Sequence, residues 1–149
     1  MFFAFEEMIR NEYIHKDIFE FEGGGSVEQL KVVYHTSEKP WTDGDKRKVI
    51  WICHALTANS DAADWWPELV GPGKLFDTEK YFVACVNMLG SPYGSSGPST
   101  INPETGKPYF LDFPRITVRD IVRANDLVRE SLGIEKIDLM VGGSIGGFQ

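Results

Sequence analysis

The sequence contains no apolar run of the roughly 18 residues that a membrane-spanning helix needs. Residues 1–10 are aromatic and acidic, so they also lack the basic start and apolar stretch of a secretory signal. Neither a membrane partner nor export through a signal peptide is therefore expected, and the sequence predicts a cytoplasmic protein.

Cysteine and histidine are scarce as well. Cys53 and Cys85 each lie inside an apolar run, which favours two buried free thiols over the alternative of a disulfide and fits a reducing compartment. No Cys-x-x-Cys pair and no cysteine–histidine spacing typical of metal ligands occurs. We therefore expect neither a metal site nor a bound cofactor.

Basic residues are outnumbered, because 15 Lys and Arg face 22 Asp and Glu and give a net charge of −7. This balance disfavours nucleic acid as a partner, since a phosphate backbone attracts positive surfaces. A chain of 149 residues can bury the core of one domain. We treat residues 1–149 as a single domain in which residues 1–15 form an N-terminal extension.

Three continuous apolar runs indicate buried strands, at residues 49–53, 81–86 and 137–141. Strands that are buried on both faces have this composition in a mostly parallel sheet covered by helices. Upstream, residues 18–21 and 27–34 flank the glycines at 23–25 and predict an N-terminal hairpin. The sequence thus predicts an α/β fold.

One helix has clear ends in the sequence. Thr117 can cap its start together with Asp120, and Gly133 can end it. Five apolar residues fall within an arc of roughly 120° on the helix, at about 100° per residue: Val118, Ile121, Val122, Val128 and Leu132. Asn125 lies inside this arc, and we interpret it as a hydrogen-bonded packing residue.

Residues 90–114 have a different character, with many Gly, Pro and Ser residues and little periodicity. Loops of this length in compact domains are usually functional or disordered. The aromatic residues Tyr93, Tyr109, Phe110 and Phe113 argue against disorder. We therefore expect a functional loop beside the active site.

Residues 142–146, Gly-Gly-Ser-Ile-Gly, match the pattern G-x-S-x-G. The pattern alone is weak, but it directly follows a predicted buried strand, as the nucleophile elbow of an α/β-hydrolase does. The sharp turn strains the serine backbone and requires small residues two positions away, because a Cβ there would collide across the turn. We therefore interpret Ser144 as a catalytic nucleophile. The alternative is a glycine-rich turn with an incidental serine.

Two backbone N–H groups are expected to form an oxyanion hole for this serine. One belongs to Ile145, the residue after the nucleophile, and we assign the other to Leu56 in the loop that follows residues 49–53. His54 begins that loop. We interpret it as a side chain that holds the loop, because the catalytic histidine of this fold follows the serine in the chain.

A serine nucleophile needs a general base, normally a histidine that is oriented by a carboxylate. His15, His35 and His54 all precede Ser144, and five residues follow it. We therefore expect the N-terminal part of an α/β-hydrolase fold, truncated after the nucleophile strand and inactive alone. Without further parallel strands, residues 137–141 should form an exposed apolar edge.

Several stretches, taken in order, resemble the homoserine O-acetyltransferase family over most of residues 49–149. They are HALT at 54–57, NMLG at 87–90, GSSGP at 94–98, INPETGKPY at 101–109, DFP at 112–114, TVRD at 117–120 and GGSIGG at 142–147. Together these stretches are far more specific than the elbow pattern alone.

The resemblance implies transfer of an acetyl group from acetyl-CoA to the hydroxyl of L-homoserine in methionine biosynthesis, with Ser144 carrying the acetyl group. Acetyl-CoA and L-homoserine would both be substrates, and the full-length parent would be a homodimer. The family's Asp and His lie downstream of its elbow, so no position here inherits those roles. An esterase, or a relative that uses succinyl-CoA or acts on serine, is the alternative.

Overall fold

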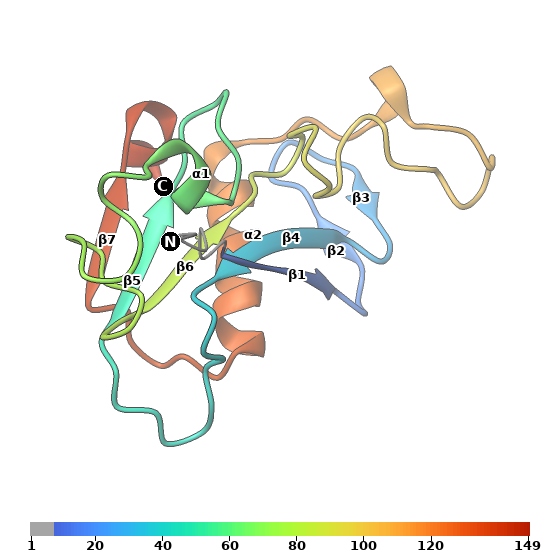
Figure 1. Ribbon diagram of the computed structural model, residues 1–149. Coiled ribbons are helices and arrows are strands. Elements are labelled where there is room, and N and C mark those ends of the chain that lie inside the picture. Colours follow the sequence, from blue (N-terminus) through green and yellow to red (C-terminus); the bar gives the residue numbers. More distant parts are fainter. Residues whose placement is uncertain (1–7) are drawn as a thin grey trace.

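The computed structural model describes residues 8–149 (Figure 1). Its centre is a five-stranded sheet in the spatial order β1-β4-β6-β5-β7. The strands are β1 (Ile9–Ile14), β4 (Lys31–Thr36), β6 (Phe82–Val86), β5 (Val49–Cys53) and β7 (Leu139–Gly142). Long connections lead from β5 to β6 and from β6 to β7. The last strand, β7, therefore lies beside β5 rather than beside β6.

Strand direction agrees with the predicted mostly parallel sheet. β5 pairs in parallel with both β6 and β7, whereas β4 pairs antiparallel with both β1 and β6. Only β4 is therefore reversed, and the other four strands run the same way. The carboxyl ends of β5, β6 and β7 consequently meet at one edge of the sheet, which is where ligands bind in open α/β sheets.

Strands β5 and β6 are buried along their whole length, as their apolar sequences predict. Alternate side chains enter two cores on opposite faces of the sheet. Trp51 and Phe82 pack on the face covered by α2 (Val118–Ser131), while Ile52 and Val83 pack on the face of α1 (Ala62–Trp65). Each such side chain contributes about 1.5–3 kcal/mol by leaving water.

Helix α2 has the predicted ends. The Thr117 hydroxyl accepts the Asp120 N–H at 3.2 Å, and the Asp120 carboxylate accepts the Thr117 N–H at 2.9 Å. Gly133 follows the helix with φ +69°, a left-handed conformation that glycine adopts without steric cost. The buried Asp120 also accepts the Glu22 N–H at 3.0 Å, so the helix start holds the N-terminal hairpin against the sheet.

The hairpin is shorter than the sequence predicts. β2 (Phe19–Glu20) pairs with β3 (Ser26–Val27) around a turn in which Gly24 and Gly25 both have positive φ. The single predicted strand over 27–34 is wrong, because the chain breaks at Gln29, whose φ is +53°. β4 then leaves the hairpin and pairs with β1 in the main sheet.

Part of the expected N-terminal extension lies in the sheet. Residues 9–14 form β1 at one edge, with Ile9 opposite Thr36 and Ile14 opposite Lys31. The strand has little apolar periodicity, so its pairing comes from the neighbouring β4 rather than from its own sequence. Residues 1–7 of the extension lie outside the described residues.

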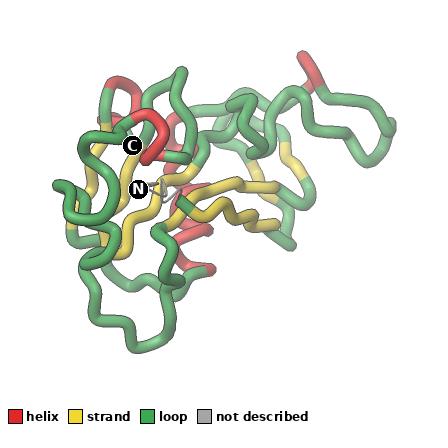
Figure 2. The backbone as a smooth tube through the Cα atoms, viewed as in Figure 1, coloured by secondary structure: helices red, strands yellow, loops and turns green. Residues whose placement is uncertain are grey.

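The long loop divides into two parts. Near its start, the buried hydroxyls of Ser95 and Ser96 accept the N–H groups of Val33 and Lys31, so the chain packs along β4. Beyond this, residues 98–113 form an arm with a short 3₁₀ turn, η1 (Phe110–Asp112). The arm projects from the side of the molecule opposite β7 (Figures 1 and 2). The predicted position beside the elbow is therefore wrong for the arm.

β7 forms the other edge of the sheet and is largely exposed. Leu139 and Met140 have 45% and 52% of their surfaces accessible, in contrast with the fully buried β5 beside them. The expected exposed apolar edge is therefore present. In a separate finding, no helix within residues 8–149 is long and apolar enough to cross a membrane.

We predict that the 149-residue chain associates through the β7 edge at concentrations of roughly 0.1 mM. Leu139→Lys should shift the chain toward monomer in size-exclusion chromatography with light scattering, because a charge opposes pairing at a strand edge. Leu111→Lys is the matched control, since Leu111 is fully exposed but lies in η1. Equal effects of the two substitutions on the oligomeric state would show that the β7 edge does not mediate the association.

Candidate active site

Ser144 lies two residues after the end of β7, beyond Gly143, and has φ +56°. Non-glycine residues rarely adopt this left-handed conformation, which costs on the order of 1–3 kcal/mol and persists only where the surroundings enforce it. The residue is exposed, so its hydroxyl is open to a substrate. The predicted elbow therefore has the backbone strain that its pattern implies.

The two glycines that flank the serine at a distance of two residues have no space for a side chain. A Cβ on Gly146 would lie 2.1 Å from the carbonyl oxygen of Cys53, and a Cβ on Gly142 would lie 2.2 Å from the carbonyl oxygen of Gly146. Neither glycine has a positive φ, so each is required by close approach rather than by backbone conformation. The predicted steric reason for the pattern is confirmed.

A short 3₁₀ segment, η2 (Ser144–Phe148), continues from the elbow. Its first internal bond joins the Gly146 N–H to the Gly143 carbonyl at 3.0 Å. Because the first N–H groups of a helix have no partner within it, the Ile145 N–H is open to an external acceptor. The assignment of Ile145 as an oxyanion donor stays a prediction that this geometry permits.

The loop after β5 lies against the elbow, because Gly146 packs on the carbonyl groups of Cys53 and His54. Within this loop, the Ala58 N–H donates to the Ala55 carbonyl at 3.0 Å and closes a turn over Leu56. Among the described residues, no protein group accepts the Leu56 N–H. The second predicted oxyanion donor thus belongs to a loop in contact with the elbow.

His54 is fully buried and holds this loop, as predicted. Its Nδ1 lies 2.8 Å from the Ala55 carbonyl oxygen, and its Nε2 accepts the Met88 N–H at 3.1 Å. Burial lowers the pKa of His54, which favours the neutral ring. With both nitrogens occupied, the ring has no free site for a substrate proton.

The other two histidines also make hydrogen bonds within the protein. His35 Nδ1 lies 2.7 Å from the Ser60 hydroxyl, and burial lowers the pKa of this imidazole. His15 Nδ1 lies 3.1 Å from the Tyr13 hydroxyl. Residues 8–149 therefore supply the predicted nucleophile, and none of these three histidines is placed as its base.

Asn87, the residue after β6, belongs to the NMLG stretch but received no role from the sequence. Its side-chain oxygen accepts the Ser60 N–H at 2.8 Å, its amide donates to the Tyr93 carbonyl at 3.3 Å, and its own carbonyl accepts the Ser95 hydroxyl at 2.9 Å. It joins the loops after β5 and β6. A polar residue directly after a buried apolar run, at the carboxyl end of a strand, was the available signal.

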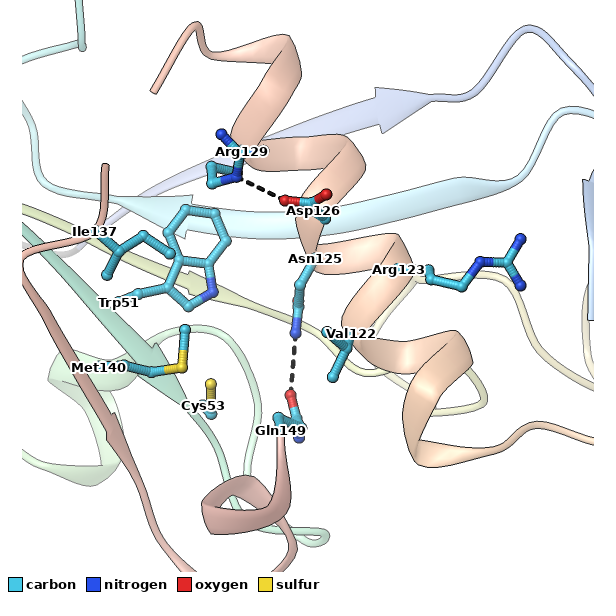
Figure 3. Close-up of a pocket in the computed structure, with 10 residues that line it drawn as sticks. All are labelled: Trp51, Cys53, Val122, Arg123, Asn125, Asp126, Arg129, Ile137, Met140 and Gln149. Carbon is cyan, nitrogen blue, oxygen red and sulfur yellow. Dashed lines mark hydrogen bonds and ion pairs between the residues drawn. The ribbon is translucent and has the colours of Figure 1, made fainter. Parts of the chain in front are cut away.

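A cavity of about 190 Å³ lies between α2 and the sheet, next to Gln149 (Figure 3). Trp51, Cys53 and Met140 line its sheet side, and Asn125 donates to the Gln149 side-chain oxygen at 3.0 Å across it. Asn125 is thus a hydrogen-bonded residue of the packed helix face, as interpreted. Its own side-chain oxygen has no partner among the described residues.

Neither cysteine is a candidate nucleophile. Cys53 and Cys85 are free and buried, and burial raises the pKa of the Cys53 thiol to about 11 and that of Cys85 well above its usual value. A thiol with a raised pKa is uncharged at neutral pH and unreactive. Within residues 8–149, no group of three or more His, Cys, Asp or Glu residues is arranged to hold a metal ion.

We predict that Gly146→Ala destabilises the protein by about 3 kcal/mol or more, because the new methyl group must displace the backbone of β5 or of the elbow. Gly143→Ala is the matched control, since no atom lies within 4 Å of a Cβ at that position and its φ is −112°. Its effect should stay within about 0.5 kcal/mol. Urea unfolding measures both, and equal midpoints would contradict the steric account.

Comparison with known proteins places these features in a family. Residues 48–149, more than half of the chain, match the α/β hydrolase fold family. The chain is 50% identical to homoserine O-acetyltransferase of Chlorobaculum parvum over 135 residues, which cover 89% of this chain and 37% of that protein.

Solved structures agree with this similarity. Homoserine O-acetyltransferase from Bacillus anthracis superposes with a TM-score of 0.82 at 33% identity, over 94% of this chain and 41% of that one. Esterase E22 also gives 0.82, at 34% identity, over 95% of this chain and 42% of its own. The chain thus spans about two fifths of the length of these relatives. Its strained serine, its parallel sheet and the family match agree, and the chain belongs to the α/β-hydrolase-fold family.

Proposed function

We propose that the gene product carrying these residues transfers an acetyl group from acetyl-CoA to the hydroxyl of L-homoserine, with Ser144 as the acyl carrier. The observation that carries the proposal is the left-handed, exposed Ser144 between Gly142 and Gly146, which have no room for side chains. In α/β-hydrolases a sharp, strained turn of this kind presents the hydroxyl of the nucleophilic serine.

In the first half-reaction, the Ser144 hydroxyl oxygen attacks the thioester carbonyl of acetyl-CoA and loses its proton to a general base. The carbonyl oxygen becomes negatively charged, and the N–H groups of Leu56 and Ile145 are proposed to bind it. The carbon–sulfur bond then breaks, and CoA leaves as a thiol after taking up a proton. The acetyl group remains on Ser144 as an ester.

In the second half-reaction, the homoserine hydroxyl loses its proton to the general base and attacks this ester through the same oxyanion geometry. The bond between the acetyl carbon and the Ser144 oxygen breaks, the serine regains its proton, and O-acetyl-L-homoserine leaves. Because CoA leaves before homoserine reacts, the mechanism predicts ping-pong kinetics.

The substrates in this proposal rest on the relatives. The region that is 50% identical to a homoserine O-acetyltransferase covers 89% of this chain. Succinyl-CoA carries a carboxymethyl group that acetyl-CoA lacks, so measuring turnover with each donor in turn tests this choice. The relatives do not identify a base among residues 8–149, and the proposal assigns this chain only the nucleophile and the two oxyanion donors.

An esterase is the second candidate, because esterase E22 superposes as well as the acetyltransferase does. Its deacylation would use water in place of the homoserine hydroxyl. The two activities separate in one assay, in which an acyl donor is supplied with and without homoserine. Faster CoA release with homoserine, together with O-acetylhomoserine formation, identifies the transferase, whereas an unchanged rate of CoA release identifies the esterase.

Compartment and assembly complete the proposal. A reducing cytoplasm is supported by the two buried free thiols, Cys53 and Cys85. A homodimer of the gene product follows from the family resemblance, and light scattering of the purified protein measures it.

We predict that Ser144→Ala in the gene product lowers homoserine-dependent CoA release by roughly 10³–10⁶-fold, since no acetyl-enzyme can form. Mass spectrometry of the wild-type protein after reaction with acetyl-CoA should find the acetyl group on the peptide that contains Ser144. Ser99→Ala is the control, because Ser99 is an exposed serine of the projecting arm. Full activity of Ser144→Ala would refute the proposal.

A further inference from the structure

The peptide unit between Ala55 and Leu56 has its orientation set by hydrogen bonds. The Ala55 carbonyl oxygen lies 2.8 Å from His54 Nδ1 and accepts the Ala58 N–H at 3.0 Å. No cis peptide bond occurs among the described residues, and in a trans peptide the C=O and N–H groups point in opposite directions. Two donors that hold the Ala55 carbonyl therefore also aim the Leu56 N–H away from them.

The neighbouring strand end determines the proton position on His54. The Met88 backbone N–H can only donate, and it points at His54 Nε2 at 3.1 Å. Nε2 must therefore be the unprotonated nitrogen, and Nδ1 carries the proton that is donated to the Ala55 carbonyl. The ring thus connects the loop after β6 to the peptide that bears the Leu56 N–H.

The same residue also contacts the nucleophile elbow. A Cβ on Gly146 would lie 2.8 Å from the His54 carbonyl oxygen, so the backbone of the elbow rests directly on the backbone of His54. The His54 side chain has no exposed surface, and its ring cannot turn away without losing both bonds. A single buried residue consequently contacts the elbow through its backbone and the Ala55–Leu56 peptide through its side chain.

We propose that His54 is a positioning residue that holds the Leu56 N–H in the orientation of an oxyanion donor. This inference rests on the proposed function, since it assigns a role within the same acyl-transfer site. The contribution of His54 is the Nδ1–H bond to the Ala55 carbonyl. It acts through the peptide and takes no proton from the substrate, because its other nitrogen is already bonded to Met88.

Replacement by Asn and by Gln separates the two ring nitrogens. An Asn amide can place a donor near the position of Nδ1, whereas the longer Gln amide reaches the position of Nε2. His54→Asn should therefore preserve the bond to the Ala55 carbonyl, and His54→Gln should lose it. The readout is the rate of Ser144 acylation by 4-nitrophenyl acetate in the gene product, measured as the burst of nitrophenol.

We expect His54→Gln to lower the acylation rate constant by roughly 10²-fold with little change in KM, because an oxyanion donor acts in the transition state. His54→Asn should stay within roughly tenfold of the wild type. His35→Gln is the matched control, since His35 is a half-buried histidine bonded to Ser60 rather than to this peptide. It should leave the acylation rate constant unchanged.

Equal rates for His54→Asn and His54→Gln, or a loss in KM alone, would overturn the proposal. The wild-type protein provides a measurement that needs no variant. A two-bond ¹H–¹⁵N spectrum at neutral pH should show His54 as the neutral Nδ1–H form, and an Nε2–H form or an imidazolium would refute the assignment.

The ester assay also separates this inference from the proposed function. It requires neither CoA nor homoserine, so a gene product that fails to acetylate homoserine but is acylated at Ser144 still tests His54. If Ser144→Ala leaves the burst unchanged, the proposed nucleophile is wrong. If the burst depends on Ser144 but not on the His54 substitutions, only the positioning role is wrong.

Discussion

The candidate site depends on the close contact between Gly146 and the carbonyl groups at the end of β5. No side chain fits there, because a Cβ would lie 2.1 Å from the Cys53 oxygen. This approach brings the turn after β7 onto the neighbouring strand and stabilises the left-handed backbone of Ser144. Strain of this kind persists only where the surrounding structure compensates for it. The parallel pairing of β5 with β7 is therefore a precondition for the exposed nucleophile.

Buried polar side chains then order the loops around this contact. His54 joins the loop after β5 to the loop after β6, and Asn87 ties both to the start of the long loop. A buried polar group without a partner costs about 1–3 kcal/mol, so each bond resists displacement of the loop that it holds. The rigid edge of the sheet thus extends into the loops that would surround an acyl group.

Several elements could be predicted because their signals are local. The apolar runs of β5 and β6, the Thr117–Asp120 capping box and the glycine spacing around Ser144 all act within a few residues. Prediction failed where distant partners decide the outcome. β1 pairs because β4 offers an edge, the break at Gln29 follows from two different pairing partners, and the arm of residues 98–113 has little local periodicity to place it.

By itself, the sequence determined the α/β class, the elbow and its serine, because strand burial and steric collision across a turn are set by neighbouring side chains. Tertiary structure alone decided which loops meet the elbow and how their polar groups are paired. The role of His54 is the clearest case. Its neutral form and its Nδ1 proton follow from the Met88 N–H, 34 residues away in the chain, which only the parallel sheet brings within 3.1 Å.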